Sequence, residues 1–260
     1  RPNDKIVKID GQSVSTMDTQ QVQNRIKGEE GTKVSVTIYR ESTGETLELE
    51  LERAQIETTT VKAELLQNQI GYIQITGFKE KTYEQFMQAY TDLQKQKMKG
   101  LIIDLRNNLG GLVDVVSKIA DELVPEGTLV YTVDKQGNRQ DTVSDAKCIE
   151  VPLVMLVNGY SASSSEILAG AVQDMGAGKL VGTQTFGKGL VQGLYFLRDG
   201  SALKITIQKY YTPKGVCIQG TGITPDYLVE LPEEYEYVMD IPHQEDTQLQ
   251  KAIEVIKQQL

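Results

Sequence analysis

The order of apolar and polar residues predicts that strands and helices alternate over most of the chain. Short apolar runs rich in β-branched residues, Leu101–Leu105 and Val151–Val157, are typical of buried strands. The segments behind them, Val113–Leu123 and Glu166–Met175, carry apolar residues at helical spacing. A strand, a turn of small residues and a helix thus occur twice, and this repetition predicts an α/β core.

The beginning of the chain follows a different pattern, with a period of two. Lys33–Arg40 and Thr46–Glu52 alternate residue by residue around a Ser-Thr-Gly segment, which predicts a hairpin. A short helix is expected over Thr19–Lys27, with Val22 and Ile26 facing inward. The sequence therefore predicts a small β-rich unit in front of the larger α/β domain.

We expect the small unit to occupy residues 1–56 and the larger domain to occupy residues 57–260. Residues 54–68 are expected to connect them and to run into a strand. Further strands are expected at Ile70–Ile75, Thr128–Val133, Lys179–Gly182, Tyr195–Leu197, Ala202–Gln208 and Lys209–Thr212, and further helices at Thr82–Lys97 and Gln248–Gln259. The apolar stripe of the last helix docks either on the core or on a second subunit.

Composition narrows the classes of function. The 260 residues are 39% hydrophobic and 24% charged, with a formal net charge of −9, which argues against nucleic acid or an anionic membrane as the main partner. No run approaches 18 consecutive apolar residues, so no transmembrane span is expected. The chain shows no signal peptide and starts without methionine, so any anchor or targeting segment would lie upstream.

Histidine and cysteine are too scarce for most metal sites. The single histidine, His243, excludes a His-rich metal centre and would have to serve alone in any Ser-His-Asp triad. Cys148 and Cys217 lack metal-ligand spacing; they form one disulfide or, more simply, remain two free thiols. We therefore expect neither a metal nor a cofactor.

Candidate chemistry centres on the serine-rich turn between the strand at Val151–Val157 and the following helix. This geometry places a serine hydroxyl at a helix N-terminus, where free backbone N–H groups can hold an oxyanion. Ser163 and Glu166 also form the spacing of a capping box, which merely starts a helix. Gly110-Gly111, in the other strand-to-helix turn, either permits positive φ angles or directs further amides at the same charge.

A nucleophilic serine needs a base, and Gly182–Lys188 offers two interpretations. Its spacing resembles the start of a phosphate-binding loop, but Gly189 places no hydroxyl for magnesium and no helix follows. Alternatively, Lys188 is the base. Small and apolar neighbours would bury its amine, and burial favours the neutral form that can accept a proton. A surface lysine in a glycine loop is the simpler third interpretation.

Several motifs resemble the C-terminal processing peptidases, also called tail-specific proteases. They are DLRNNLGGL, NGYSASSSEILAGA, VGTQTFGKGLVQ, DGSALKITIQKYYTPKG and IQGTGITPD, in that family's order over roughly residues 70–230. The resemblance implies a Clp-protease/crotonase-like α/β core. In front of it, PNDKIVKIDGQSV resembles the second half of a PDZ domain. The loop with which such domains bind a peptide carboxylate lies upstream of the matched part.

The resemblance also implies roles for single residues. Ser163 takes the place of the family's nucleophile, Lys188 that of its base, and Gln192 that of the glutamine that orients the lysine. The resemblance implies an oxyanion hole formed by the backbone N–H of Ser164 and by one N–H from the turn that contains Gly110 and Gly111. Either of these two glycines could supply that second N–H.

Two positions depart from the family pattern. Ser164 stands where alanine is usual and Leu109 where proline is usual, and neither should alter the chemistry if only backbone amides act. Ser161, Ser164 and Ser165 remain rival nucleophiles.

The resemblance implies a serine endopeptidase that cleaves protein substrates near an accessible C-terminus through an acyl-enzyme. It implies an extracytoplasmic location, in the cell envelope or as a secreted protein. A homodimer is left open. Two other classes remain: a non-catalytic peptide-binding or scaffold protein of the same fold, and a serine–lysine amidase acting on small amides.

Overall fold

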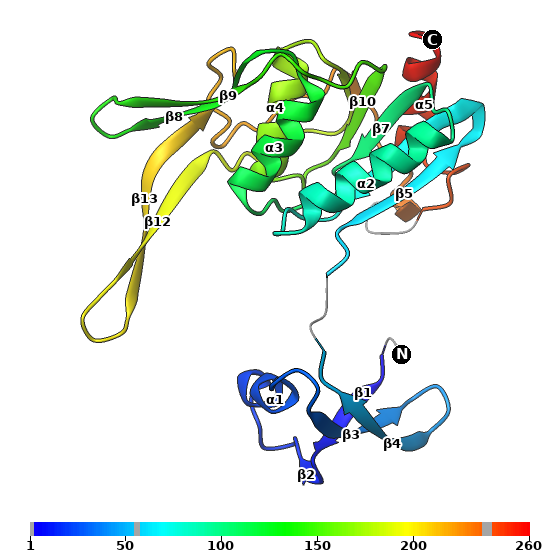
Figure 1. The fold of residues 1–260 in the computed structure, drawn as a ribbon, viewed down its shortest axis with the longest axis vertical. Helices are drawn as coiled ribbons and strands as arrows, with labels where there is room; N and C mark the ends of the chain where they lie inside the picture. Colours follow the sequence, from blue (N-terminus) through cyan, green and yellow to red (C-terminus); the bar gives the residue numbers. More distant parts are fainter. Residues whose placement is uncertain (1–2, 55–57, 236–240) are drawn as a thin grey trace. The chain divides into compact units, whose positions relative to one another are not determined.

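Residues Arg1–Thr58 and Thr59–Leu260 pack as separate units. The computed structural model describes residues 3–54, 58–235 and 241–260 (Figure 1). The expected domain boundary between residues 56 and 57 falls outside the described residues. No helix in these ranges is long and apolar enough to cross a membrane.

The first unit is an antiparallel sheet with one helix, as the period-two pattern predicts. In the part described, the strand order is β2-β1-β3-β4. Its elements are β1 (Lys5–Ile9), β2 (Gln12–Ser13), α1 (Thr19–Ile26), β3 (Lys33–Arg40) and β4 (Glu45–Glu52). Alternate residues of β3 are buried beside Ile9, and Val22 and Ile26 of α1 pack against them, as expected.

The second unit is built on a mostly parallel sheet. The described residues form six strands in the order β14-β11-β10-β7-β6-β5, and only β5 runs antiparallel to its neighbour. They are β5 (Val61–Leu66), β6 (Ile70–Ile75), β7 (Gly100–Asp104), β10 (Leu153–Val157), β11 (Lys179–Gly182) and β14 (Tyr227–Leu228). The end of the predicted connector is thus a paired strand, β5, which a short 3-10 turn over Gln67–Gln69 joins to β6.

Helices cover both faces of this sheet, because β7 and β10 carry apolar residues on both sides. On one face, Ile103 and Met155 pack in a core with α2 (Thr82–Lys95), α3 (Val113–Leu123) and α4 (Ser164–Asp174). On the other face, Ile102 and Val154 pack against α5 (Thr247–Lys257). The apolar stripe of the last helix therefore docks on the core, one of the two outcomes expected for it.

A second, antiparallel sheet has the strand order β12-β13-β8-β9 among the described residues. It comprises β8 (Gly127–Asp134), β9 (Arg139–Ser144), β12 (Leu190–Phe196) and β13 (Ala202–Tyr211). Figure 1 shows β12 and β13 as a long ribbon that extends away from the helices of its unit. Two predictions were wrong here. β12 begins five residues earlier than expected, and β13 is one strand rather than two, because cross-strand pairing with β12 and β8 continues through Gln208 and Lys209.

Strand order decides which loops meet. β10 lies between β7 and β11, and all three are parallel, so their carboxyl ends open at one edge of the sheet. The loops that leave this edge are the glycine turn 105–112, the serine turn 158–163 and the lysine loop 183–189. In open α/β sheets, binding sites form at this edge.

Candidate active site

Ser163 ends the serine turn in a strained backbone conformation. It is the residue that precedes α4, with φ 58° and ψ −115°, in the left-handed region that non-glycine residues rarely occupy. Such strain is stored mainly at functional sites, where the surroundings enforce it. The side chain is partly exposed, whereas Ser161, Ser164 and Ser165 are buried.

The three rival serines donate their hydroxyl groups to backbone carbonyls of the glycine turn. The bonds run from Ser161 Oγ to Leu105 O (2.8 Å), from Ser164 Oγ to Gly111 O (2.9 Å) and from Ser165 Oγ to Asn108 O (2.8 Å). Each hydroxyl is thus buried and already used to hold the two turns together. Ser163 is the serine of this motif with a side chain that a substrate can reach.

The glycine turn touches the nucleophile candidate directly. A Cβ on Gly110, which has φ +101°, would lie 2.8 Å from Ala162 O and 3.0 Å from both Ser163 Cβ and the Ser164 nitrogen. Only a glycine leaves this space open. Within the ranges the structure describes, the amides of Ser164 and Gly111 have no hydrogen-bond acceptor, whereas Gly110 N–H donates to Asn108 Oδ1 at 2.9 Å.

The carboxylate of Glu166 joins the serine turn to the lysine loop. Its Oε2 accepts a hydrogen bond from the Ser163 amide (2.9 Å) and one from the Lys188 amide (2.8 Å). Two backbone nitrogens that share one acceptor lie within about 6 Å of each other. Glu166 therefore caps the N-terminus of α4 through the backbone amide of Ser163. This bond does not involve the hydroxyl group of Ser163 and leaves it available for chemistry.

The side chains of Lys188 and Gln192 are exposed to solvent, whereas a buried amine was expected for Lys188. Lys188 is exposed, and its Nζ has no hydrogen bond or ion pair to any described residue. Gln192 is exposed on β12, beside a register shift that follows Val191. The structure thus places the backbone of Lys188 at Ser163 without burying its amine. Burial failed as a prediction because Lys188 leads into the exposed β12–β13 ribbon.

The phosphate-loop interpretation of Gly182–Lys188 is excluded by two features. The loop leads into a strand, β12, where a phosphate-binding loop needs a helix. The amides of Gly187 and Lys188, which would have to cradle a phosphate, donate instead to the carboxylate of Glu166. A second anion in the same cradle would be repelled.

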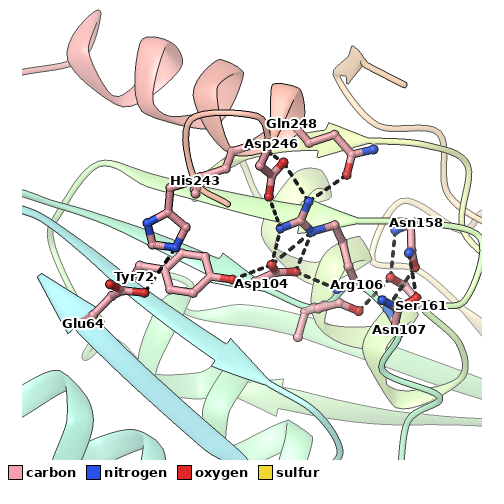
Figure 2. A network of polar contacts seen from close by, with 12 residues as sticks. Glu64, Tyr72, Asp104, Arg106, Asn107, Asn158, Ser161, His243, Asp246 and Gln248 are labelled. Carbon is pink, nitrogen blue, oxygen red and sulfur yellow. Dashed lines mark hydrogen bonds and ion pairs between the residues drawn. The ribbon is translucent and has the colours of Figure 1, made fainter. Parts of the chain in front are cut away.

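A second polar cluster, centred on Arg106, lies at the start of the glycine turn (Figure 2). The guanidinium forms ion pairs with Asp104 (2.6 Å) and with Asp246 (2.7 Å), at the N-terminus of α5. All three side chains are almost completely buried. Burial alone would lower the pKa of Arg106, but the two carboxylates raise it above its ordinary value. No sequence pattern predicted this cluster, although a charged residue at the end of a buried strand was a signal for it.

The cluster continues towards the serine turn. Asn107 and Asn158 exchange two hydrogen bonds of 3.0 Å. The backbone N–H of Asn107 donates to Asn158 Oδ1, and the side-chain Nδ2 of Asn158 donates to Asn107 Oδ1. Tyr72 donates its hydroxyl to Asp104, and burial together with that carboxylate raises the pKa of Tyr72. The Arg106 cluster thus anchors the glycine turn and, through the asparagine pair, the serine turn.

The remaining candidates take no part in the site. His243 contacts Glu64 at 3.4 Å, its ring is tilted against that of Tyr72 with centroids 6.0 Å apart, and it makes no hydrogen bond with Ser163 in the described structure. Cys148 and Cys217 are free thiols, as the simpler interpretation held. Among the described residues, no group of three or more His, Cys, Asp and Glu side chains could hold a metal ion.

Comparison with known proteins gives two family matches. A family model described as peptidase family S41 matches residues 69–229, and one described as a PDZ domain matches residues 1–40. A carboxyl-terminal-processing protease of Synechocystis sp. is 39% identical over 261 residues, covering 98% of this chain and 61% of that protein. The carboxy-terminal processing protease CtpA of Bacillus subtilis is 36% identical over 235 residues, covering 90% of this chain and 50% of that protein. The chain spans 50–61% of the length of these two relatives.

Solved structures agree with the observed architecture. A photosystem II D1 C-terminal processing protease has a TM-score of 0.63 at 36% identity, covering 89% of this chain and 65% of that one. A putative S41 protease of Bacteroides fragilis has a TM-score of 0.64 at 15% identity, covering 98% of this chain and 73% of that one, and so shares the fold alone.

Proposed function

Because this chain belongs to peptidase family S41, we propose that it is a serine endopeptidase in which Ser163 is the nucleophile and Lys188 the general base. One observation carries the assignment of Ser163: it is the strained, partly exposed serine of a motif whose other hydroxyls are all committed to backbone carbonyls. The families expected from the sequence motifs, the S41 peptidases and PDZ domains, are both confirmed.

The reaction begins when the neutral amine of Lys188 takes the hydroxyl proton of Ser163. Ser163 Oγ then attacks the scissile carbonyl carbon, and the carbonyl oxygen becomes an oxyanion. The amides of Ser164 and Gly111 are the donors for that charge, since neither has another acceptor in the described ranges. The sequence left Gly110 and Gly111 as alternative donors to the oxyanion. In this proposal Gly111 donates its N–H group, and Gly110 lacks the side chain that would collide with the serine turn.

The tetrahedral intermediate collapses when the C–N bond breaks and Lys188 returns the proton to the leaving amine. This leaves an acyl-enzyme on Ser163 Oγ. A water molecule, deprotonated by Lys188, then attacks the ester and restores both residues. Gln192 orients the lysine in this scheme. The exposed amine of Lys188 must turn towards Ser163 for this reaction. The backbones of the two residues are already held close together, because both backbone amides donate to Glu166.

The substrate in this proposal is a polypeptide with an accessible C-terminus, cleaved in an extracytoplasmic compartment. The names of the relatives as carboxyl-terminal-processing proteases support the C-terminal substrate. The partial PDZ unit is consistent with a protein substrate. A homodimer remains a prediction, and the apolar face of α5 is not its surface, because that face packs on the central sheet.

The test uses an unstructured protein as substrate and mass spectrometry to detect C-terminal trimming. Ser163→Ala and Lys188→Ala should each lower the rate by about 10³-fold or more, the scale seen when a catalytic serine or its base is removed. A fluorophosphonate probe should label the native protein on Ser163 alone.

The controls separate chemistry from folding. Lys204→Ala removes another exposed lysine, on β13, and should leave cleavage unchanged. Far-ultraviolet circular dichroism and urea unfolding should show that both site variants stay folded. Label on Ser161, Ser164 or Ser165, or full activity in Lys188→Ala, would contradict the assignment. Absence of both label and cleavage in the native protein would favour the scaffold alternative.

A further inference from the structure

Glu166 is a buried carboxylate to which the proposed chemistry assigns no task. Its side chain is 0% exposed, and no lysine, arginine or histidine forms an ion pair with it among the described residues. Removing a charged carboxylate from water is costly unless strong hydrogen bonds replace the lost hydration. A fold keeps such a group only where its hydrogen bonds are well formed.

Both oxygens of Glu166 have their full set of donors in the described structure. Oε2 accepts from the amides of Ser163 and Lys188 at 2.9 and 2.8 Å. Oε1 accepts from the Gly187 amide at 2.7 Å and from the Thr185 hydroxyl at 2.6 Å. All four partners are donors, which is the pattern of hydrogen bonds that the two oxygens of a carboxylate accept.

The donors come from the two loops that carry the reacting groups. Ser163 belongs to the serine turn, and Thr185, Gly187 and Lys188 belong to the lysine loop, so one side chain spans the gap between them. These loops leave neighbouring parallel strands, β10 and β11. A single acceptor shared by two amides holds the backbones of Ser163 and Lys188 close together.

Thr185 extends the connection to a third segment. Its hydroxyl accepts a hydrogen bond from the Ile223 amide at 2.7 Å, so its proton is directed at Glu166. The same segment packs tightly on the lysine loop: a Cβ on Gly222 would lie 2.3 Å from the carbonyl oxygen of Thr185. The loop around Gly222 thus packs against Thr185 and helps to fix the position of the lysine loop.

We propose that Glu166 is the positioning residue of this peptidase, which holds the backbones of Ser163 and Lys188 in register so that the hydroxyl and the amine can meet. This inference rests on the proposed function, since it assigns those two residues their roles. Glu166 touches neither substrate nor reacting atom. It acts through the two amides that it holds, so its loss should slow the chemical step and leave substrate binding nearly unchanged.

Glu166→Gln tests the proposal with the smallest change in shape. Glutamine keeps one carbonyl oxygen but turns the other oxygen into an NH₂ group, which faces two donors and cannot accept from them. We expect kcat for cleavage to fall about 100-fold, which corresponds to about 2.7 kcal/mol, with KM within about threefold of the native value. Labelling of Ser163 by the fluorophosphonate should slow by a similar factor.

Asp246→Asn is the matched control, because it makes the same exchange in a buried carboxylate that contacts neither the serine turn nor the lysine loop. It should lose stability while kcat, measured on folded protein, changes less than about threefold. Urea unfolding of each variant defines the conditions under which all are fully folded.

A second pair keeps the test decisive if Glu166→Gln does not fold. Thr185→Val removes one of the four donors at nearly constant volume, and Thr185→Ser keeps the hydroxyl. We expect Thr185→Val to slow Ser163 labelling about tenfold and Thr185→Ser to restore it.

The outcomes separate this inference from the proposed function. Native-like labelling and kcat in folded Glu166→Gln, or in Thr185→Val, would overturn the positioning role while the peptidase assignment stands. An equal fall in kcat in Asp246→Asn would reduce Glu166 to a general stabiliser. A native protein that neither labels nor cleaves would overturn the peptidase itself.

Discussion

Glu166 and Asp104 are two buried carboxylates in the same unit whose surroundings differ in charge. Asp104, together with Asp246, surrounds the guanidinium of Arg106, so charges of both signs lie within one buried cluster. Glu166 accepts hydrogen bonds from three backbone amides and one hydroxyl, all of them uncharged. Both carboxylates are fully hydrogen-bonded, but Asp104 binds mainly side-chain groups, whereas Glu166 binds mainly backbone amides.

The difference concerns what each cluster fixes. The Arg106 cluster ties side chains together and joins the N-terminus of α5 to the end of β7. Buried ion clusters of this kind can often be exchanged for apolar residues of equal volume without loss of stability. The Glu166 cluster fixes main-chain atoms of two loops, and an apolar residue would leave their amides without an acceptor. We infer that the first is an anchor for the fold and the second a constraint on the chemistry.

The largest effect on stability is expected from Arg106→Met. It leaves Asp104 and Asp246 buried side by side without their shared cation, and breaking a buried pair in this way costs about 3–5 kcal/mol. The free energy of unfolding in urea measures the loss. The triple variant with Asp104→Asn and Asp246→Asn removes the unpaired charges and should regain part of it. A loss below about 1 kcal/mol for Arg106→Met would show that the cluster is not an anchor.

A smaller, pH-dependent effect is expected from Asp226, a surface carboxylate in the same unit. Partial burial alone would raise its pKa, but hydrogen bonds from the Leu180 amide, Lys179 and Gln173 lower it below its ordinary value of 3.8. A carboxyl group with a lower pKa in the folded state stabilises the fold above its unfolded pKa. That contribution is lost as the pH falls through the folded value.

Asp226→Asn should therefore weaken the dependence of stability on pH below about pH 4, by at most about 1 kcal/mol at such an exposed site. Urea unfolding at pH 7 and at about pH 3 measures the difference. An unchanged pH dependence in the variant would assign the acid sensitivity to other carboxylates.

The smallest expected effect is the coupling between the two clusters. Glu166 and Asp246 share no hydrogen-bond partner in the described structure, so their losses of stability should add to within about 0.5 kcal/mol in the double variant Glu166→Gln/Asp246→Asn. A larger coupling energy would show that the Asn107–Asn158 pair transmits strain between the turns, and the two clusters would then have to be treated as one.

The elements that could be predicted were those that depend on local pattern. α3 was expected at Val113–Leu123 and β11 at Lys179–Gly182, and both have these bounds. The start of β12 at Leu190 was missed, because a glycine-rich stretch gives no period-two signal and pairing with β13 supplies what the local sequence lacks. The docking of α5 was left open, since an amphipathic helix shows that it has a partner surface but not which one.

The site was predicted in its parts and not in its connections. A role for the glycine turn beside Ser163 was one of two interpretations of Gly110-Gly111, and the fold brings the two turns together. The family resemblance implied Ser163 as the nucleophile but kept Ser161, Ser164 and Ser165 as rivals. In the structure the hydroxyl groups of these three serines are buried and donate to carbonyls of the glycine turn. The Arg106 cluster was missed because Arg106 and Asp246 are 140 positions apart along the chain. The expected burial of Lys188 was wrong, since flanking glycines say little about solvent exposure.

The sequence by itself determined the family, the alternation of strands and helices, and the types of residue available for chemistry, because these follow from short motifs and from local periodicity. Only the tertiary structure decided that three loops open at one edge of the sheet. It also decided that Glu166 holds two of them together. The reason is physical: a carboxylate finds its donors through strand order and chain reversal, and these bring side by side residues whose separation along the chain carries no signal.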